Sequence, residues 1–410
     1  MTASGILAKT KKVVLKLTMV IWGLFLCVSI LSLLSCEKSD SNTEYMLVDP
    51  EEHIYPETNS EIEEVIPIKY DYVYSFSEGL AAVQLDKKWG FIDKTGKEVI
   101  PLQYSEVYSF SEGVAWVSLP NFNGEHSPRL FGLIDKDGNE VLPHDYVGVS
   151  SFSEGLARIR INDEYNLIDK TGKTVISGYD SISNFSEGLV AVGFDDIESG
   201  GASHKYCYID KTGRVVTPLS SLVYYYDFQD GLRIDFSEGL AAFRIDETFG
   251  FIDKNGNMAI PNDYAFVHGF SEGLSAVWNN GKHGYIDKTG REIISFADEW
   301  LSLGNFSESR AYIIKGSYVG YIDKKGEVVI PFVYFCENGH NDWAHDFSEG
   351  LVVVIKGNWE TGVKYGFIDE AGKEIVPFVY DGAQDVSEGL AAVCIDHEDT
   401  GKKWGFIAIK

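Results

Sequence analysis

The chain has 410 residues, and its 62 Asp and Glu outnumber its 35 Lys and Arg, which gives a formal net charge of −27. A hydrophobic share of 44% is enough for a packed core and excludes wholesale disorder. The acidic balance argues against a nucleic-acid partner, because binding a phosphate backbone needs clustered Lys and Arg. Five cysteines in this length are too few for a disulfide-dense scaffold.

The first 35 residues indicate a targeting segment. A lysine-containing start precedes an apolar run from Leu17 to Leu34, and Ser35-Cys36 follows directly. The end of this run resembles the lipobox of bacterial lipoproteins. The resemblance implies that residues 1–35 are a signal peptide and that Cys36 becomes a lipidated N-terminus. A retained membrane anchor is the alternative, since the run is long enough to cross a bilayer.

Residues 36–62 are polar and acidic and show no periodicity, so we expect a flexible tether. Fully extended, it would reach roughly 85 Å at about 3.3 Å per residue. Removal of residues 1–35 deletes four Lys and no acid, which takes the net charge from −27 to −31. An acidic body is repelled by anionic lipid, so the acyl chains on Cys36 would hold the protein at the membrane. We therefore expect a lipoprotein of the bacterial cell envelope, in the outer membrane, on its surface or its periplasmic face.

Residues 63–410 repeat one unit. The phrase Phe-Ser-Glu-Gly-Leu/Val occurs at 76–80, 110–114, 152–156, 185–189, 236–240, 270–274 and 347–351, with degenerate copies at 306–310 and 386–390. A second phrase, Gly-Phe-Ile-Asp-Lys-Thr-Gly at 90–96, interleaves with it, and a third, Val/Ile-Ile-Pro, opens at 65–67. The shortest spacings between Ser-Glu-Gly copies are 33, 34, 34 and 36 residues, which indicates a repeat architecture.

Each unit has a β pattern. Leu80–Leu85 and Lys88–Ile92 read as two strands, and Lys97–Ile100 as a third. Asp93-Lys94-Thr95-Gly96 has the chemistry of a type I turn that is closed by a left-handed Gly. No window of the body shows helical periodicity. The sequence therefore predicts an all-β fold of about nine three-stranded antiparallel units. Cys207, Cys336 and Cys394 are expected to be buried or free.

The segments Lys88-Trp89-Gly90-Phe91-Ile92-Asp93 and Lys403-Trp404-Gly405-Phe406-Ile407, with the recurring Ser-Glu-Gly-Leu-Ala, resemble the WG (or KWG) repeats of bacterial proteins. The resemblance covers residues 63–410 and implies a binding or scaffold module without a defined activity. In other copies the Trp is replaced by a mostly aromatic residue, which indicates a packing role. The replacements are Phe131, Tyr165, Tyr206, Phe249, His283, Val319 and Tyr365.

Two global shapes fit these units. We expect an open, solenoid-like array, because three strands and about 34 residues fall short of an ordinary propeller blade and nine blades exceed the common number. The alternative is a closed, propeller-like ring. The repeat begins with a lone third strand at Val65–Pro67 and ends after a second strand at Gly405–Ile407, so a ring could use the first to complete the last.

Recurrent acidic residues are interpreted as turn residues. The Asp of Ile-Asp-Lys recurs eight times from Asp93 to Asp369, and such ladders bind Ca²⁺ in some β-repeats. The stronger interpretation is an Asp that hydrogen-bonds the backbone of its own turn. Ser77, Glu78 and their copies are likewise expected to cap backbone donors rather than to act as catalytic acids.

Insertions are the candidate ligand contacts. Residues 118–130, 195–205, 357–364 and 396–403 lengthen the same connection, so they are expected to lie along one edge. The candidate binding residues are Asp195, Asp196, Glu198, Tyr224, Tyr225 and Tyr226. A metal site is a further hypothesis, with ligands His340, Asp342, His345 and Asp346.

No motif for nucleophilic, metal-dependent or phosphate chemistry is found, so an enzyme is not expected, nor is a cofactor. The sequence favours a non-catalytic binding module for a protein or a glycan. The alternatives are a structural scaffold of the periplasm and a calcium-dependent, adhesin-like repeat protein.

Overall fold

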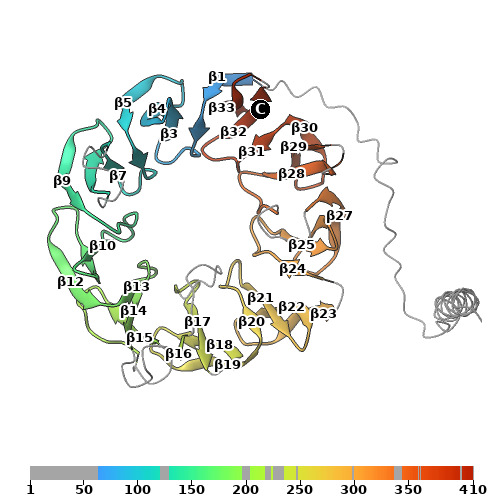
Figure 1. Cartoon of the computed structure of the whole chain (residues 1–410). Helices are drawn as coiled ribbons and strands as arrows, with labels where there is room; N and C mark the ends of the chain where they lie inside the picture. The colour runs from blue at the N-terminus through green and yellow to red at the C-terminus, as the bar shows by residue number, and fades with distance from the viewer. Residues whose placement is uncertain are drawn as a thin grey trace, which may run out of the picture. The chain divides into compact units, whose positions relative to one another are not determined.

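The computed structural model describes residues 63–120, 129–195, 204–217, 223–224, 235–245, 248–297, 300–336, 344–358, 360, 362–397 and 399–409. Within these ranges the regular elements are β-strands, which form nine separate antiparallel sheets arranged in a ring (Figure 1). The same ranges contain no helix that could cross a bilayer. The all-β prediction is confirmed, while Cys36, the leader and the tether lie outside the described residues.

Each sheet is built from strands that occupy up to four successive positions. First strands are only two residues long: β2 (Tyr72–Val73), β6 (Glu106–Val107), β13 (Ser181–Ile182), β20 (Phe266–Val267), β24 (Ser302–Leu303) and β31 (Gly382–Ala383). Second strands are β3 (Leu80–Leu85), β7 (Val114–Ser118), β10 (Ala157–Ile161), β14 (Leu189–Asp195), β17 (Leu240–Ile245), β21 (Leu274–Asn279), β25 (Ala311–Lys315), β28 (Leu351–Asn358) and β32 (Leu390–His397).

Third strands are β4 (Lys88–Asp93), β8 (Phe131–Asp135), β11 (Glu164–Ile168), β15 (His204–Asp210), β18 (Thr248–Asp253), β22 (Lys282–Asp287), β26 (Tyr318–Ile322), β29 (Gly362–Asp369) and β33 (Gly401–Ala408). Fourth strands are β5 (Glu98–Tyr104), β9 (Glu140–Tyr146), β12 (Thr174–Tyr179), β16 (Val223–Tyr224), β19 (Met258–Tyr264), β23 (Glu292–Ala297), β27 (Val328–Phe335), β30 (Glu374–Tyr380) and, from the start of the repeats, β1 (Glu63–Tyr70).

We number the sheets as blades 1 to 9: β2–β5, β6–β9, β10–β12, β13–β16, β17–β19, β20–β23, β24–β27, β28–β30, and β31–β33 with β1. Figure 1 shows the first strands near the centre of the ring and the fourth strands at its rim. The prediction of three strands per unit missed the first strand, which six of the nine described sheets contain. Two residues are too few to show a period of two in the sequence.

The ring closes through the two ends of the repeat region. β1 pairs antiparallel with β33, with Ile66 opposite Phe406 and Tyr70 opposite Trp404. Blade 1 shows the same register between β5 and β4, where Ile100 lies opposite Phe91. The preferred open array is therefore wrong, and the closed ring with the first strand completing the last blade is confirmed. Closure buries Ile66 and Tyr70 and removes the two unpaired edges that an open array would expose.

A bulge in the fourth strand explains the Gly of the Trp-Gly pair. Trp89 pairs with Tyr104 and Phe91 with Ile100, so the three residues 89–91 of β4 lie opposite the five residues 100–104 of β5. The backbone of the bulge crosses directly over Gly90, and a Cβ there would lie 2.5 Å from the Ile100 carbonyl oxygen. In blade 3 the corresponding stretch of β12 is one residue shorter, and Asn166 replaces the Gly.

We expect Gly90→Ala to lower the free energy of unfolding by about 1–3 kcal/mol, because the added methyl group meets backbone atoms rather than a movable side chain. The matched control is Gly269→Ala, where the nearest atom to the added Cβ is the Ser237 Cβ at 3.9 Å. Guanidinium unfolding measures both. Equal stability of the two variants would contradict the close approach at Gly90.

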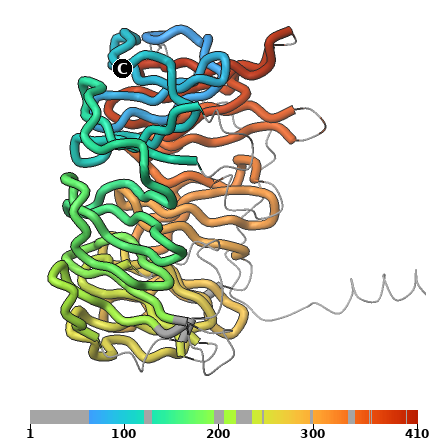
Figure 2. The backbone as a smooth tube through the Cα atoms, turned by 60° about the vertical axis from the view of Figure 1, so that its left-hand side comes forward, coloured from blue at the N-terminus to red at the C-terminus, as the bar shows by residue number. Residues whose placement is uncertain are grey.

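The ring has two different faces. One carries the Ser-Glu-Gly and Asp-Lys turns, since the start of each second strand pairs with the end of the third, as Leu80 does with Asp93. The hairpins between second and third strands project from the other face. Figure 2 shows two long examples, β28–β29 and β32–β33, extending to the right in orange-red and red. All four predicted insertions lengthen this hairpin, so the expectation of one common edge is confirmed for the strands that bear them.

Candidate ligand-binding site

The Ser-Glu-Gly turns are type I′ hairpins that also join neighbouring blades. In the first copy Glu78 has φ 55° and Gly79 φ 88°, the two positive angles that this turn requires. Ser77 donates its hydroxyl hydrogen to the Phe110 carbonyl of the next blade at 2.8 Å. The same bond recurs at all nine junctions with lengths of 2.6–2.9 Å, ending with Ser387 on Phe76. The turn interpretation of Ser and Glu is correct, and the partners lie in the adjacent repeat.

The turn glutamates form a second ring of contacts. Glu78 accepts a hydrogen bond from the Gly113 N–H of blade 2 at 2.8 Å. It also forms an ion pair with Lys136 of the same blade at 3.0 Å. Seven such Lys–Glu pairs occur among the described residues, with Lys94, Lys136, Lys170, Lys211, Lys254, Lys288 and Lys324. The Glu backbone sits in a left-handed conformation that disfavours a side chain, and these contacts offset that cost.

The junction between blades 7 and 8 reverses these charges. Glu370 occupies the place of the usual Lys, while Arg310 replaces the apolar residue that follows the turn. The Arg310 side chain reaches across the junction, with Nη2 3.9 Å from Glu370 Oε2 and Nε donating to the Glu370 carbonyl at 3.4 Å. In the degenerate copy at 306–310 the basic and acidic partners have therefore changed places, and the contact between the two blades is kept.

Acid is expected to weaken the ring through these carboxylates. Burial raises the pKa of Glu78, but hydrogen bonds from Lys136 and the Gly113 N–H outweigh it, so the pKa lies below its ordinary value. The pKa values of Glu154, Glu187 and Glu388 are lowered by the same balance. A lowered folded-state pKa contributes stability above the unfolded value, near pH 4.5, and this contribution is lost as the pH falls through the folded-state value.

We therefore expect the melting temperature to fall as the pH drops from about 5 to about 3, and Glu→Gln at these four positions to flatten this dependence. Each partly exposed pair is worth at most about 1 kcal/mol, so the combined variant is the informative one. Glu98→Gln, at an exposed position of β5, is the control. A fourfold variant with an unchanged pH profile would show that the turn glutamates do not set acid stability.

The Asp residues of Ile-Asp-Lys serve their own turns. Asp93 Oδ1 accepts hydrogen bonds from the Thr95 N–H at 2.9 Å, the Thr95 hydroxyl at 2.6 Å and the Lys97 N–H at 3.1 Å. The equivalent hydroxyl of Thr212, with backbone donors, lowers the pKa of Asp210 to about 2. No cluster of three metal-ligating side chains occurs in the described part of the chain. The turn interpretation is confirmed at these residues.

The structure describes only some of the residues of each predicted site. Asp195 ends β14 and Tyr224 ends β16, and both pair with His204 of β15, which lies between them. Asp196, Glu198, Tyr225 and Tyr226 lie outside the described residues, as do His340 and Asp342 of the metal hypothesis. His345 Nδ1 lies 2.7 Å from Asp385 Oδ1 in blade 9, and Asp346 follows His345 in the chain. Both site hypotheses remain predictions. Cys207, Cys336 and Cys394 are buried, as expected.

One of the pockets among the described residues lies at the junction between blades 6 and 7, where two repeat positions both carry smaller side chains. At two other junctions an aromatic residue of the third strand contacts an aromatic first-strand residue of the next blade. Trp404 and Tyr72 lie 5.8 Å apart between ring centroids, and Phe249 and Phe266 5.9 Å apart. Between blades 6 and 7 the corresponding residues are His283 and Ser302. A pocket of about 100 Å³ opens there, lined also by Phe266, His268, Ala276, Val277, Trp278 and Leu303.

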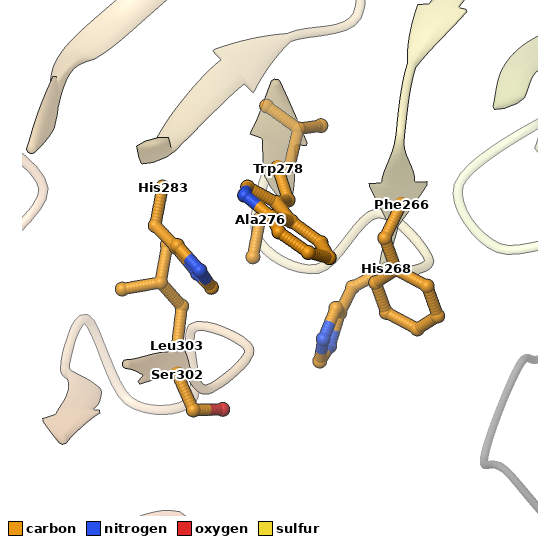
Figure 3. Close-up of a pocket in the computed structure, with 8 residues that line it drawn as sticks. Phe266, His268, Ala276, Trp278, His283, Ser302 and Leu303 are labelled. Atoms are coloured by element: carbon orange, nitrogen blue, oxygen red, sulfur yellow. The ribbon is translucent and has the colours of Figure 1, made fainter. Parts of the chain in front are cut away.

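Trp278 forms the exposed wall of this pocket. It lies opposite both Phe266 and His283 in the sheet, so the three side chains share one face of blade 6. The indole is 42% exposed and stacks on the His283 ring at 5.7 Å with an interplanar angle of 24°. Figure 3 shows Trp278, His283, Ser302 and His268 around a common space, with the Ser302 hydroxyl directed into it.

Both imidazoles of the pocket are uncharged at neutral pH. Burial lowers the pKa of His268, an effect that the neighbouring Asn305 only partly opposes. Burial also lowers the pKa of His283. Each ring therefore offers one N–H donor and one nitrogen acceptor. The pocket combines an exposed aromatic face with neutral hydrogen-bonding groups.

Sequence reasoning noticed His283 only as a variant of the Trp position and missed Trp278. The pairing register between the second and third strands could have singled out Trp278. The nine positions opposite the Trp place are all described, and Trp278 is the aromatic residue among them. The other eight are Gln84, Ser118, Arg160, Gly193, Arg244, Ile314, Ile355 and Cys394.

Comparison with known proteins identifies the family. A family model described as "WG containing repeat" matches residues 59–89, 89–119, 131–165, 167–196, 249–282, 320–358 and 365–407. These matches cover more than half of the chain, which therefore belongs to the family of WG-repeat proteins. The segment between residues 282 and 320, which contributes His283 and Ser302 to the pocket, is left unmatched. No curated protein sequence matches the chain.

Several solved structures are similar at low sequence identity. One is titled as the crystal structure of the eukaryotic initiation factor, with 11% identity, 84% of each chain covered and a TM-score of 0.42. PorZ, described as a bacterial surface component of the type-IX secretion system of Porphyromonas gingivalis, shows 10% identity over 85% of this chain and 52% of PorZ, with a TM-score of 0.30. Hsv2 of Kluyveromyces lactis shows 9% identity over 84% of this chain and 98% of Hsv2, with a TM-score of 0.28.

Proposed function

We propose that this chain is a non-catalytic binding module of the bacterial cell envelope, held at a membrane by lipidated Cys36, and that its ring binds a glycan. The observation that carries the proposal is the pocket between blades 6 and 7. The repeated positions are satisfied by core packing and inter-blade bonds, whereas Trp278 and His283 depart from the repeat at one place. A unique, half-exposed aromatic residue in a repeated frame supports a ligand contact more than a packing role.

The chemistry of the lining favours a sugar ring. Phe266 and Trp278 supply apolar surface, and the neutral His268 and His283 with the Ser302 hydroxyl supply uncharged donors and acceptors. A pyranose has an apolar face of C–H groups and a rim of neutral hydroxyls, so it matches both parts of the lining. The volume of about 100 Å³ is suited to the edge of one such ring rather than to a folded protein segment.

The test is direct binding of free sugars to the soluble chain 37–410. Glucose, mannose, galactose and N-acetylglucosamine, with their linear oligomers of two to four units, are titrated by calorimetry. We expect at least one series to bind, and Trp278→Ala to weaken that binding roughly 10- to 100-fold, because the variant removes the stacking surface.

Tyr72→Ala is the matched control, since Tyr72 is 43% exposed and lies at the equivalent of Phe266 in blade 1. It should leave sugar binding unchanged. Absence of binding across the whole panel, or equal binding by Trp278→Ala and the unmodified chain, would refute the proposal.

A further inference from the structure

A second, more polar pocket lies on the inner edge of the same part of the ring. Its volume is about 300 Å³, and its walls come from blades 4 to 7: Phe185, Ser186, Asp235, Phe236, Ser237, Gly269, Phe270, Ser271 and Asn305. Asp235, Gly269 and Asn305 occupy equivalent positions, each directly before the repeated aromatic residue. The first three blades have Ser at this position. Gly269 therefore leaves room between the polar side chains of its two neighbours.

The two pockets adjoin along the chain and in space. In blade 6, Phe266 and His268 line the Trp278 pocket, while Gly269 and Phe270 line the second pocket. In blade 7 the first pocket uses Ser302 and Leu303 and the second uses Asn305. An offset of two to three residues corresponds to roughly 7–10 Å along an extended chain.

The second pocket presents mainly hydrogen-bond acceptors. The hydroxyls of Ser186, Ser237 and Ser271 donate to the carbonyl groups of the next blades at 2.6 Å each, so what these hydroxyls still offer to a ligand is acceptor lone pairs. Asp235 adds a carboxylate to the same wall and Asn305 an amide. A ligand that fits must therefore donate hydrogen bonds from several positions, as the hydroxyls of a sugar do.

We propose that the ligand is an oligosaccharide of at least two linked rings, with one ring against Trp278 and the next in the polar pocket beside Gly269. This inference rests on the proposed function, because it extends the same site from a single ring to a chain. It assigns the first pocket to stacking and the second to recognition of hydroxyl groups.

The experiment fills the second pocket without touching the first. In Gly269→Val the added Cβ meets no close neighbour, since the nearest atom is the Ser237 Cβ at 3.9 Å. In the unmodified chain 37–410, the trimer of the sugar series that binds is expected to bind at least tenfold more tightly than its monosaccharide. Gly269→Val should abolish this gain and leave the monosaccharide affinity unchanged.

Ser109→Val, which adds the same side chain at the equivalent position of blade 2, should retain the full gain. If Gly269→Val fails to fold, as thermal melting would show, Gly269→Ser replaces it and should lose part of the gain. Equal affinity for monosaccharide and trimer, or a gain that survives Gly269→Val, would overturn this inference while leaving single-sugar binding intact. Sugar binding that is independent of Trp278 would instead overturn the proposed function and this inference together.

Discussion

Removing β1 is expected to open the ring and to cost most of its stability. The chain 71–410 lacks the strand that pairs with β33, and with it Ile66 at 0% and Tyr70 at 4% exposure. Burial of two such side chains is worth about 3–6 kcal/mol, before the lost backbone bonds are counted. Folded domains have a net stability of about 5–15 kcal/mol, so we expect a melting temperature far below that of the chain 63–410, or no cooperative transition.

A peptide of residues 63–70 added in trans provides the sharper test. It should restore part of the lost melting temperature in a concentration-dependent way, because a ligand that binds only the folded state stabilises it. A peptide of scrambled sequence should have no effect. If the chains 71–410 and 63–410 melted at the same temperature, β1 would not close the ring.

Replacement of Cys36 is expected to abolish lipidation and to leave residues 1–35 attached to the chain. Under the proposed lipidation, all acyl chains are attached at Cys36, and each buried methylene contributes about 0.8 kcal/mol to anchoring. Cys36→Ala should also block removal of residues 1–35, so mass spectrometry would find the longer chain. Membrane fractionation followed by immunoblotting measures both the location and the length.

Cys27→Ala is the control, because Cys27 lies within the same apolar run and precedes the proposed cleavage site. This variant should behave like the unmodified protein. If the unmodified protein carried no acyl chain and had the same full length as Cys36→Ala, a retained anchor helix would replace the lipoprotein proposal.

The sequence predicted the strands of the blade because they follow local rules. Leu80–Leu85 and Lys88–Asp93 are apolar runs bounded by turn residues, and the structure shows both as strands with the expected hairpin turn after Asp93. Closure was harder to predict because it depends on the rotation between successive blades, which no single repeat encodes. The matching partial units at 65–67 and 405–407 carried the correct signal, but the comparison with ordinary propeller blades outweighed it.

The candidate site was predicted less well because it depends on contacts between repeats. The insertions were the predicted ligand contacts, because their composition differs most from the repeat. The Trp278 pocket instead arises from substitutions within the regular repeat. His283 and Ser302 are 19 positions apart in sequence and belong to different blades, so their joint effect appears only once the junction is assembled. The same holds for Ser77 and Glu78, whose partners lie in the neighbouring repeat.

Fluorine NMR of the chain 37–410 labelled with 5-fluorotryptophan tests the central claim most directly, namely that the ring takes a glycan at the Trp278 pocket. The Trp278 resonance is assigned by its absence in Trp278→Phe, and Trp116, which is buried at 1% exposure, provides an internal reference. During titration with the binding oligosaccharide, we predict that the Trp278 signal shifts and saturates while the Trp116 signal stays in place. Saturable binding with an unmoved Trp278 signal would contradict the account.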